Sequence, residues 1–279
     1  MRIYLIIILI FNKEKALSAQ LQRRSGRHLF PLPILLALFP EPLRHYAEAV
    51  RIGPATGDDV MPAALMSEPA GPAPLRHALN AMTAHYGGDD ARVAGSVWAR
   101  HCFSALLPGT VAAAALAHHV LPLRDAAIRP DGHGRAVTLV LPHAGRTLPG
   151  APPQQRFSAL LDDLLVPLVE ALAAASGASP RLLWANAGAV VAEVFRHAPA
   201  LLQPGLPATD ATLAADAAWL MDTRTRPDGR DNPLHAPMRA HRVTQDGTTT
   251  TLWLRRLCCL RYRLPAFTLC GDCPRRLLR

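Results

Sequence analysis

The amino-acid sequence predicts an α+β fold, with a mostly α-helical body, two small β-hairpins and a C-terminal, cysteine-rich, cluster-binding tail. Apolar residues recur at helical spacing along most of the chain, and capping residues and glycines mark where these segments begin and end. The spacing changes to that of strands in two places, each beside an Asp-Gly turn. Four of the five cysteines follow the second of these places.

The predicted helices follow from their caps and their terminators. Asp89 or Asp90 caps one of them, Ser179 caps another with Pro180 at its first position, and Asp210 caps a third. A break is expected at Pro108-Gly109, because proline removes a helical hydrogen bond. The expected helical segments are residues 42–52, 74–86, 90–107, 110–120, 157–175, 180–197 and 210–221.

The two predicted hairpins divide the chain. The first covers residues 128–141, and the second turns at Gln245-Asp246-Gly247 and returns over residues 248–254. That second hairpin leads directly into the cysteines. The chain is therefore expected to consist of an N-terminal extension (1–34), a helical body (35–240) and a hairpin with a cluster-binding segment (241–279).

The N-terminal extension has an apolar run from Ile3 to Phe11, which is too short to span a bilayer and is followed at once by charged residues. We interpret it as a start placed too far upstream; an export signal is the alternative. A cytoplasmic location is expected, where thiols stay reduced and clustered cysteines bind metal.

The chain carries 30 Lys+Arg against 21 Asp+Glu, a formal charge of +9. Its arginines are mostly isolated, and aromatic residues make up 5% of the chain, so no nucleic-acid partner is expected. The sequence has no P-loop, no dinucleotide-binding glycine motif, no Gly-x-Ser-x-Gly elbow and no HExxH motif. We therefore expect the chemistry to reside in the metal, with no catalytic side chain beyond the cysteine-bound cluster.

The metal ligands expected from spacing are Cys258, Cys259, Cys270 and Cys273. Four thiolates suit a structural zinc ion or an iron–sulfur cluster. Adjacent cysteines do not form the usual zinc knuckle, because neighbouring side chains of an extended segment diverge, and this favours a [2Fe–2S] cluster without excluding zinc. Cys102, in the middle of a predicted helix, is expected to be a buried apolar residue.

The segment from Arg255 through Cys273-Pro274 closely resembles the C-terminal [2Fe–2S] segment of the FhuF-like ferric siderophore reductases. Upstream resemblances follow in the order of that family and extend the likeness over about residues 35–279; they are Leu38-Phe39-Pro40, Ser96-Val-Trp98-Ala, Arg181-Leu-Leu-Trp184-Ala-Asn186 and Asn232-Pro233-Leu234. The segment before Leu35 has no counterpart in the resemblance.

The resemblance implies a one-electron reduction of a ferric siderophore, with release of ferrous iron, by an enzyme that takes electrons from a separate ferredoxin- or flavodoxin-like donor. It leaves peripheral contact with the inner membrane open. Candidate substrate-binding residues are Trp98, Trp184 and Asn186, for which core packing is the simpler interpretation. Candidates for electrostatic tuning or donor docking are Arg255, Arg256, Arg261 and Arg263; a solvated basic face is the alternative. The alternative function is a non-enzymatic protein, either a zinc-stapled binding module or an iron–sulfur sensor.

Overall fold

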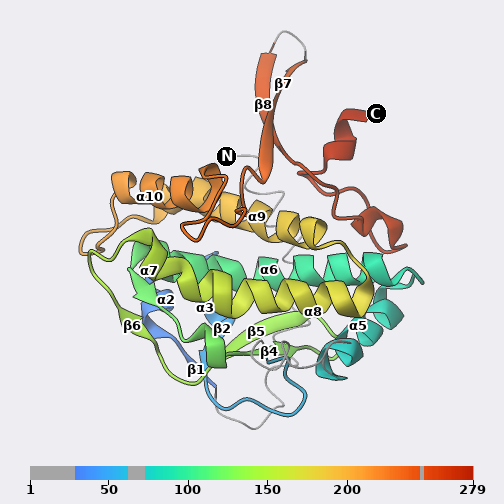
Figure 1. Ribbon diagram of the computed structural model, residues 1–279, viewed down its shortest axis with the longest axis horizontal. Helices are drawn as coiled ribbons and strands as arrows, with labels where there is room; N and C mark the ends of the chain where they lie inside the picture. Colours follow the sequence, from blue (N-terminus) through green and yellow to red (C-terminus); the bar gives the residue numbers. More distant parts are fainter. Residues whose placement is uncertain (1–28, 62–72, 246–247, 279) are drawn as a thin grey trace.

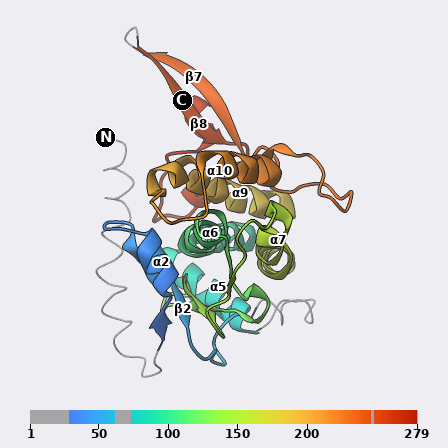
Figure 2. The same ribbon diagram turned by 90° about the vertical axis from the view of Figure 1, so that its left-hand side faces the viewer.

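The computed structural model describes residues 29–61, 73–245 and 248–278. Its architecture is α+β, as predicted, with helices stacked around α6 (Ala91–Leu116), a sheet on one side and a hairpin on the other (Figure 1). Figure 2 shows α6 nearly end-on, between α9 above it and the sheet below it. The predicted extension lies outside the described residues up to residue 28.

Helix α6 is the central element and is buried along almost its whole length. Asp90 caps it as predicted, accepting a hydrogen bond from the Arg92 backbone N–H at 3.0 Å. The predicted break at Pro108-Gly109 is wrong, because the helix continues through Pro108 to Leu116. Its apolar residues are enclosed on all sides, and this burial outweighs the hydrogen bond that the proline removes.

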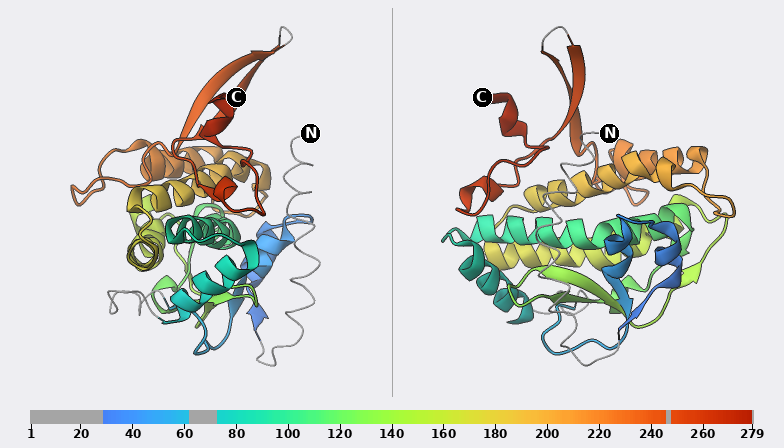
Figure 3. Two further views of the ribbon diagram at one scale, coloured as in Figure 1. Left: turned by 90° about the vertical axis from the view of Figure 1, so that its right-hand side faces the viewer. Right: turned by 180° about the vertical axis from the view of Figure 1, so that it is seen from behind.

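Other helices surround α6 on several sides (Figure 3). Most of the predicted segments are confirmed, but residues 159–165 and 218–222 adopt π-helical geometry, and Thr209, not Asp210, caps the helix before the second of these. The helices are α2 (Pro33–Leu38), α3 (Arg44–Glu48), α5 (Ala73–Tyr86), α7 (Pro153–Ser158), η2 (Ala159–Leu165), α8 (Val166–Ser176), α9 (Pro180–His197), α10 (Asp210–Ala217) and η4 (Ala218–Asp222), with short 3-10 turns η1 (Leu123–Asp125), η3 (Ala198–Leu201), η5 (Arg261–Arg263) and η6 (Pro274–Leu278).

The first predicted hairpin is confirmed as β4 (Ala127–Pro130) and β5 (Ala136–Leu141). It belongs to a four-stranded sheet in the order β1-β2-β5-β4, in which β1 is Phe30–Pro31 and β2 is Val50–Ile52. The sequence pattern assigned residues 50–52 to a helix. They form a strand parallel to β5 instead, a pairing between distant segments that local periodicity does not reveal. A further small pair joins β3 (His119–Val120) to β6 (Arg146–Thr147).

The second predicted hairpin is β7 (Met238–Gln245) paired with β8 (Thr248–Arg255). It projects from the body above α9, and the C-terminal tail runs from its base down to the N-terminal half of α6 and then turns back up toward the hairpin (Figure 1). The predicted turn residues Asp246 and Gly247 lie outside the described residues. Within the described ranges, none of the helices combines the length and the apolar character needed to cross a bilayer.

The body begins earlier in the chain than residue 35. Phe30 and Pro31 pair with β2, and Leu32 is buried in the core. β1 and the first two residues of α2 therefore lie before the boundary expected at residue 35.

Candidate metal centre

The tail (residues 256–278) is nearly devoid of regular structure, and turns set the direction of its cysteines. Leu260 adopts a left-handed conformation, with a φ of 62°, directly after Cys259. A tight turn lies between Cys270 and Cys273, where the Cys273 N–H donates to the Cys270 carbonyl at 3.2 Å. These two bends bring the four thiols of the tail together.

The four sulfur atoms form two pairs. The Sγ atoms of Cys258 and Cys273 are 3.7 Å apart, and those of Cys259 and Cys270 are 3.8 Å apart. A tetrahedral metal with bonds of about 2.3 Å to sulfur separates two of its ligands by about 3.8 Å. Among the described residues, no three metal-ligating side chains converge on a single ion. Each sulfur pair therefore has the spacing of two thiolates on one metal ion, and two such pairs match a centre of two metal ions.

The two pairs differ in exposure. Cys259 and Cys270 are buried, and Cys273 is buried as well, whereas Cys258 is only half-buried. The pair of Cys259 and Cys270 is therefore an inner pair facing the helical body, and Cys258 gives the outer pair a route to the surface. The small apolar cluster of these cysteines with Leu269 is separate from the main core.

Protonation also distinguishes the thiols. The hydrogen bond from Cys270, supported by Arg100 and Arg255, lowers the pKa of Cys259, while the same hydrogen bond raises the pKa of Cys270. Burial raises the pKa of Cys258 to about 11. A metal ion replaces these protons, since thiolates are the binding form. Within the inner pair, Cys259 is therefore the thiol that loses its proton first.

A chain of buried hydrogen bonds ties the tail to the body. The Ser96 hydroxyl donates to the Cys259 carbonyl at 2.9 Å, and the Asn186 amide donates to the Ser96 hydroxyl and carbonyl at 3.1 and 3.0 Å. Arg255 then donates to the Asn186 side-chain oxygen at 2.8 Å. Helices α6 and α9 and the end of β8 are therefore joined through polar groups directly behind the inner cysteine pair.

Aromatic packing holds the loop between the cysteine pairs. Phe267 lies 4.7 Å from Tyr86 and 6.1 Å from His101, measured between ring centroids. The Arg261 guanidinium covers the Phe267 ring at 5.1 Å. Gly88, which has a φ of 103°, leaves room for Leu264, because a Cβ there would lie 2.8 Å from the Leu264 side chain. The loop therefore packs against the C-terminal end of α5 and the N-terminal half of α6.

The three candidate substrate residues have mainly internal contacts. Trp98 is fully buried and donates its indole N–H to the Gly134 carbonyl at 2.8 Å. Asn186 is also buried; its side-chain amide donates to the Ser96 hydroxyl and accepts from Arg255. Trp184 is half-buried against the core. Their contacts match the packing interpretation, and Asn186 in addition positions the tail.

The four candidate arginines occupy different environments. Arg255 is buried, with its Nε 3.1 Å from Asp272, so it is not available for docking. Arg263 is exposed and forms an ion pair with Asp90 at 3.0 Å. Arg256 is exposed, and Arg261 is partly covered by its contact with Phe267.

Arg100 is a charged residue near the cysteines that the sequence pattern did not single out. Its Nη2 atom lies 3.8 Å from Asp272, the residue that directly precedes Cys273. Its spacing of four residues from Ser96, which belongs to the family resemblance, is the signal that places it on the face toward the tail.

Cys102 is confirmed as a buried residue of the core, and burial alone raises the pKa of its thiol. It lies on α6 and belongs to the main apolar core, separate from the four cysteines of the tail.

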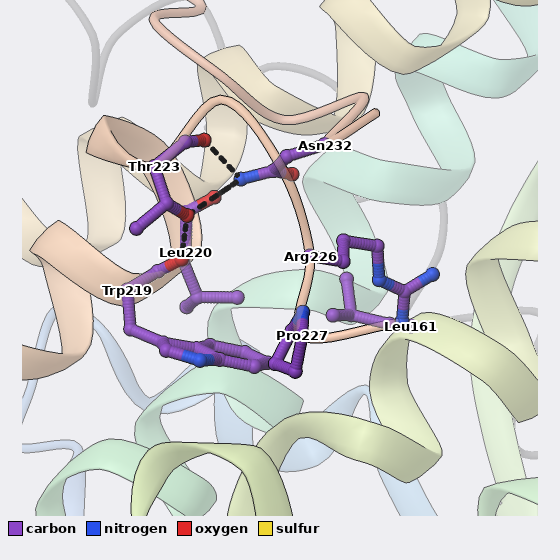
Figure 4. Close-up of a pocket in the computed structure, with 7 residues that line it drawn as sticks. All are labelled: Leu161, Trp219, Leu220, Thr223, Arg226, Pro227 and Asn232. Atoms are coloured by element: carbon purple, nitrogen blue, oxygen red, sulfur yellow. Dashed lines mark hydrogen bonds between the residues drawn. The ribbon is translucent and has the colours of Figure 1, made fainter. Parts of the chain in front are cut away.

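A shallow hollow of about 200 Å³, including its solvent-open part, lies elsewhere on the body (Figure 4). Both π-helical segments contribute to it, and the Asn232 amide is occupied by the backbone carbonyls of Leu220 and Thr223 at 2.9 Å each. The hollow is smaller than the roughly 300 Å³ at which pockets for small molecules begin. Its lining residues are Leu161, Trp219, Leu220, Thr223, Arg226, Pro227 and Asn232.

Comparison with known proteins identifies both parts of the chain. The family described as "Ferric iron reductase FhuF-like transporter" matches residues 96–248, and the "FhuF 2Fe-2S C-terminal domain" matches residues 255–275. The "Ferric siderophore reductase" of Escherichia coli (strain K12) is 36% identical over 121 residues, which are 43% of this chain and 41% of that protein. The matched region thus spans less than half the length of this relative.

The first match begins at Ser96, the residue that holds the Cys259 carbonyl, and the second contains all four paired cysteines. The cofactor of the tail is accordingly a [2Fe–2S] cluster, in agreement with the two sulfur pairs. On these matches, the chain belongs to the FhuF-like family of ferric iron reductases and ends in the [2Fe–2S] domain of that family.

Proposed function

We propose that this protein reduces a ferric siderophore by one electron and that Cys258, Cys259, Cys270 and Cys273 are the ligands of its [2Fe–2S] cluster. The observation that carries the proposal is the arrangement of four thiols in two pairs, 3.7 and 3.8 Å apart, within the segment that matches the family's cluster domain. The similarity to a named ferric siderophore reductase supports the choice of substrate.

The proposed reaction follows from the coordination chemistry of iron. Siderophores hold Fe(III) through hard anionic oxygens, and these bind the larger and less acidic Fe(II) much more weakly. One electron therefore suffices to release the metal. When bound, a [2Fe–2S] cluster supplies one electron at a time, which matches this demand.

The tail determines where the substrate approaches. Ser96 and Asn186 fix the inner pair against the body, and the aromatic contacts of Phe267 cover one side of the loop. Cys258 is the ligand least enclosed by protein. We therefore place the approach of the siderophore on the side of Cys258, where the electron has the shortest path to solvent.

The source of electrons is proposed to be a separate acidic protein of the ferredoxin or flavodoxin class in the cytoplasm. The sequence has no motif for a nucleotide or flavin that would deliver electrons internally. The hairpin and the tail carry a group of exposed arginines, which complement an acidic surface; these are Arg239, Arg242, Arg256, Arg275 and Arg276.

Anaerobic purification tests the cofactor ligands. We expect a coloured protein with two irons and two sulfides per chain and with visible absorption that dithionite bleaches. A colourless protein that retains one tightly bound zinc after anaerobic reconstitution would refute the cluster and favour the zinc-stapled binding module.

A second assay tests the reductase activity. The dithionite-reduced protein, freed of excess dithionite, is mixed anaerobically with a ferric siderophore and a ferrous chelator. We expect reoxidation of the protein together with ferrous chelate, one equivalent per cluster, and no reaction when NADPH is the only reductant. Reoxidation no faster than in buffer alone would reject the reductase and favour an iron–sulfur sensor.

A further inference from the structure

Arg100 lies on the face of α6 that contacts the tail. It follows Ser96 by four residues, so the two side chains lie on the same side of the helix. Ser96 donates its hydroxyl hydrogen to the Cys259 carbonyl at 2.9 Å, which fixes that side as the one under the inner cysteine pair. The Arg100 side chain is 21% exposed and therefore lies mostly between the helix and the tail.

Asp272 is the partner of Arg100 in the tail. It lies between Cys270 and Cys273, and its two carboxylate oxygens face different arginines. Oδ1 is 3.8 Å from Arg100 Nη2, and Oδ2 is 3.1 Å from Arg255 Nε. Two cations thus share one anion, which directly precedes Cys273 in the chain, and these three groups together carry a net positive charge.

We propose that Arg100 and Asp272 tune the reduction potential of the tail cluster in opposite directions, Arg100 raising it and Asp272 lowering it. The inference deepens the proposed function and rests on it only in requiring a redox-active cluster. Reduction adds one negative charge, which a nearby cation stabilises and a nearby anion destabilises. Arg100 and Asp272 therefore act on the cluster through their charges, without binding the metal.

The charge on Arg100 is maintained. Burial lowers the pKa of its guanidinium, whereas the Asp272 carboxylate raises it, and the net shift is upward. Partial burial also reduces the screening of this charge by solvent and salt. Its effect on the cluster is therefore expected to exceed that of the exposed arginines of the tail.

Arg100 is a better test position than Arg255. Arg255 is buried and also donates to the Asn186 side chain, so its removal would leave polar groups without partners inside the protein. Arg100 sits at the edge of the contact and is partly exposed. Glutamine at this position retains the first part of the side chain, so Arg100→Gln removes the charge and leaves part of the packing in place.

The test is an anaerobic redox titration with dithionite and dye mediators, followed by visible absorption and by electron paramagnetic resonance. Arg100→Gln should shift the reduction equilibrium about tenfold toward the oxidised form. For one electron, this corresponds to a reduction potential about 59 mV lower than that of the wild type. Asp272→Asn should shift it in the opposite direction. Arg100→Lys keeps the charge and should stay near the wild-type potential.

Arg263→Gln is the matched control, because Arg263 lies in the tail but is exposed and forms an ion pair with Asp90. It should leave the potential near that of the wild type. A purely structural role of Arg100 would lower cluster content or melting temperature in both Arg100 variants, without a potential that follows the sign of the charge.

Three results would overturn the proposal: an unchanged potential in Arg100→Gln, a shift of Arg100→Gln and Asp272→Asn in the same direction, or an equal shift in Arg263→Gln. If Asp272→Asn does not bind the cluster, the reduction potentials of Arg100→Gln and Arg100→Lys still test the effect of the charge at position 100. The titration uses no siderophore, so a protein that fails to reduce siderophores can still show the predicted order of potentials.

Discussion

Arg255 and Asn186 meet in the interior of the protein, 69 positions apart in the sequence. The guanidinium donates from Nη1 to the Asn186 side-chain oxygen at 2.8 Å and from Nη2 to the backbone oxygen of the same residue at 3.2 Å. Both side chains are almost completely inaccessible to solvent. This contact fixes the end of β8, and with it the start of the cysteine tail, on α9.

Replacing Asn186 with Leu should destabilise the protein by about 3 kcal/mol, because the buried Nη1 of Arg255 loses its acceptor and the buried Ser96 carbonyl loses a donor. Ser96→Ala removes one neutral hydrogen-bonding group and should cost only about 1 kcal/mol. Anaerobic unfolding in guanidinium chloride measures both. A variant Asn186→Leu as stable as the wild type would contradict the positioning role.

Cys102→Ser should retain the cluster, since Cys102 lies in the main core and not in the cysteine cluster of the tail. Serine at Cys258, Cys259, Cys270 or Cys273 should abolish or strongly alter it. Iron and sulfide counts with the visible spectrum measure this. Loss of the cluster in Cys102→Ser, in a protein that still folds, would overturn the assignment.

The pairing of the sulfurs predicts which cysteines oxidise together in the protein without metal. Cys258→Ser/Cys273→Ser leaves the complete pair of Cys259 and Cys270, whose sulfurs are 3.8 Å apart, and it should form a disulfide rapidly under mild oxidant. Cys258→Ser/Cys270→Ser leaves one member of each pair and should oxidise more slowly.

Counting free thiols after denaturation and alkylation follows both reactions, with Cys102 as a constant background. Equal rates in the two double variants would argue against the observed pairing.

His101 should make the protein less stable in mild acid. Burial, with nearby Arg135, Arg100 and Arg261, lowers the pKa of its imidazole to about 3 in the folded state, whereas an unfolded histidine has a pKa of about 6.5. Between these values the unfolded chain binds more protons, so stability falls as the pH falls.

His101→Phe keeps a ring beside Tyr86 but removes this titration. When the pH falls from 7 to 5, the free energy of unfolding should decrease in both proteins, and the decrease should be about 2 kcal/mol smaller in His101→Phe than in the wild type. Denaturant unfolding at both pH values measures the difference. Parallel losses in the two proteins would show that His101 does not contribute.

Exposed arginines of the tail should accelerate reduction by an acidic donor. Arg256→Glu or Arg275→Glu should slow the reaction with a reduced ferredoxin several-fold at low salt, and the difference should fade above about 0.1 M salt, where the Debye length is about 10 Å. Arg146→Glu is the control, because it is equally exposed but lies on β6, at the other side of the body (Figure 1). Stopped-flow rates that fall equally in all three variants would contradict a docking surface near the cluster.

The sequence by itself determined the features that are local. Caps and turn residues placed α5, α9 and both hairpins, and the spacing of Cys258, Cys259, Cys270 and Cys273 indicated a four-thiolate centre. Each of these signals depends on residues within a few positions of one another, where backbone preferences act directly.

Only the tertiary structure decided the rest, because it depends on contacts between distant segments. Burial carried α6 through Pro108, and pairing with β5 turned residues 50–52 into a strand. Three features of the site also depend on the fold of the chain. They are the grouping of the sulfurs into two pairs, the hydrogen bond between Arg255 and Asn186, and the approach of Arg100 to Asp272. Spacing in the sequence predicts the ligands, but the packing of the tail on α6 and α9 determines the charge around them.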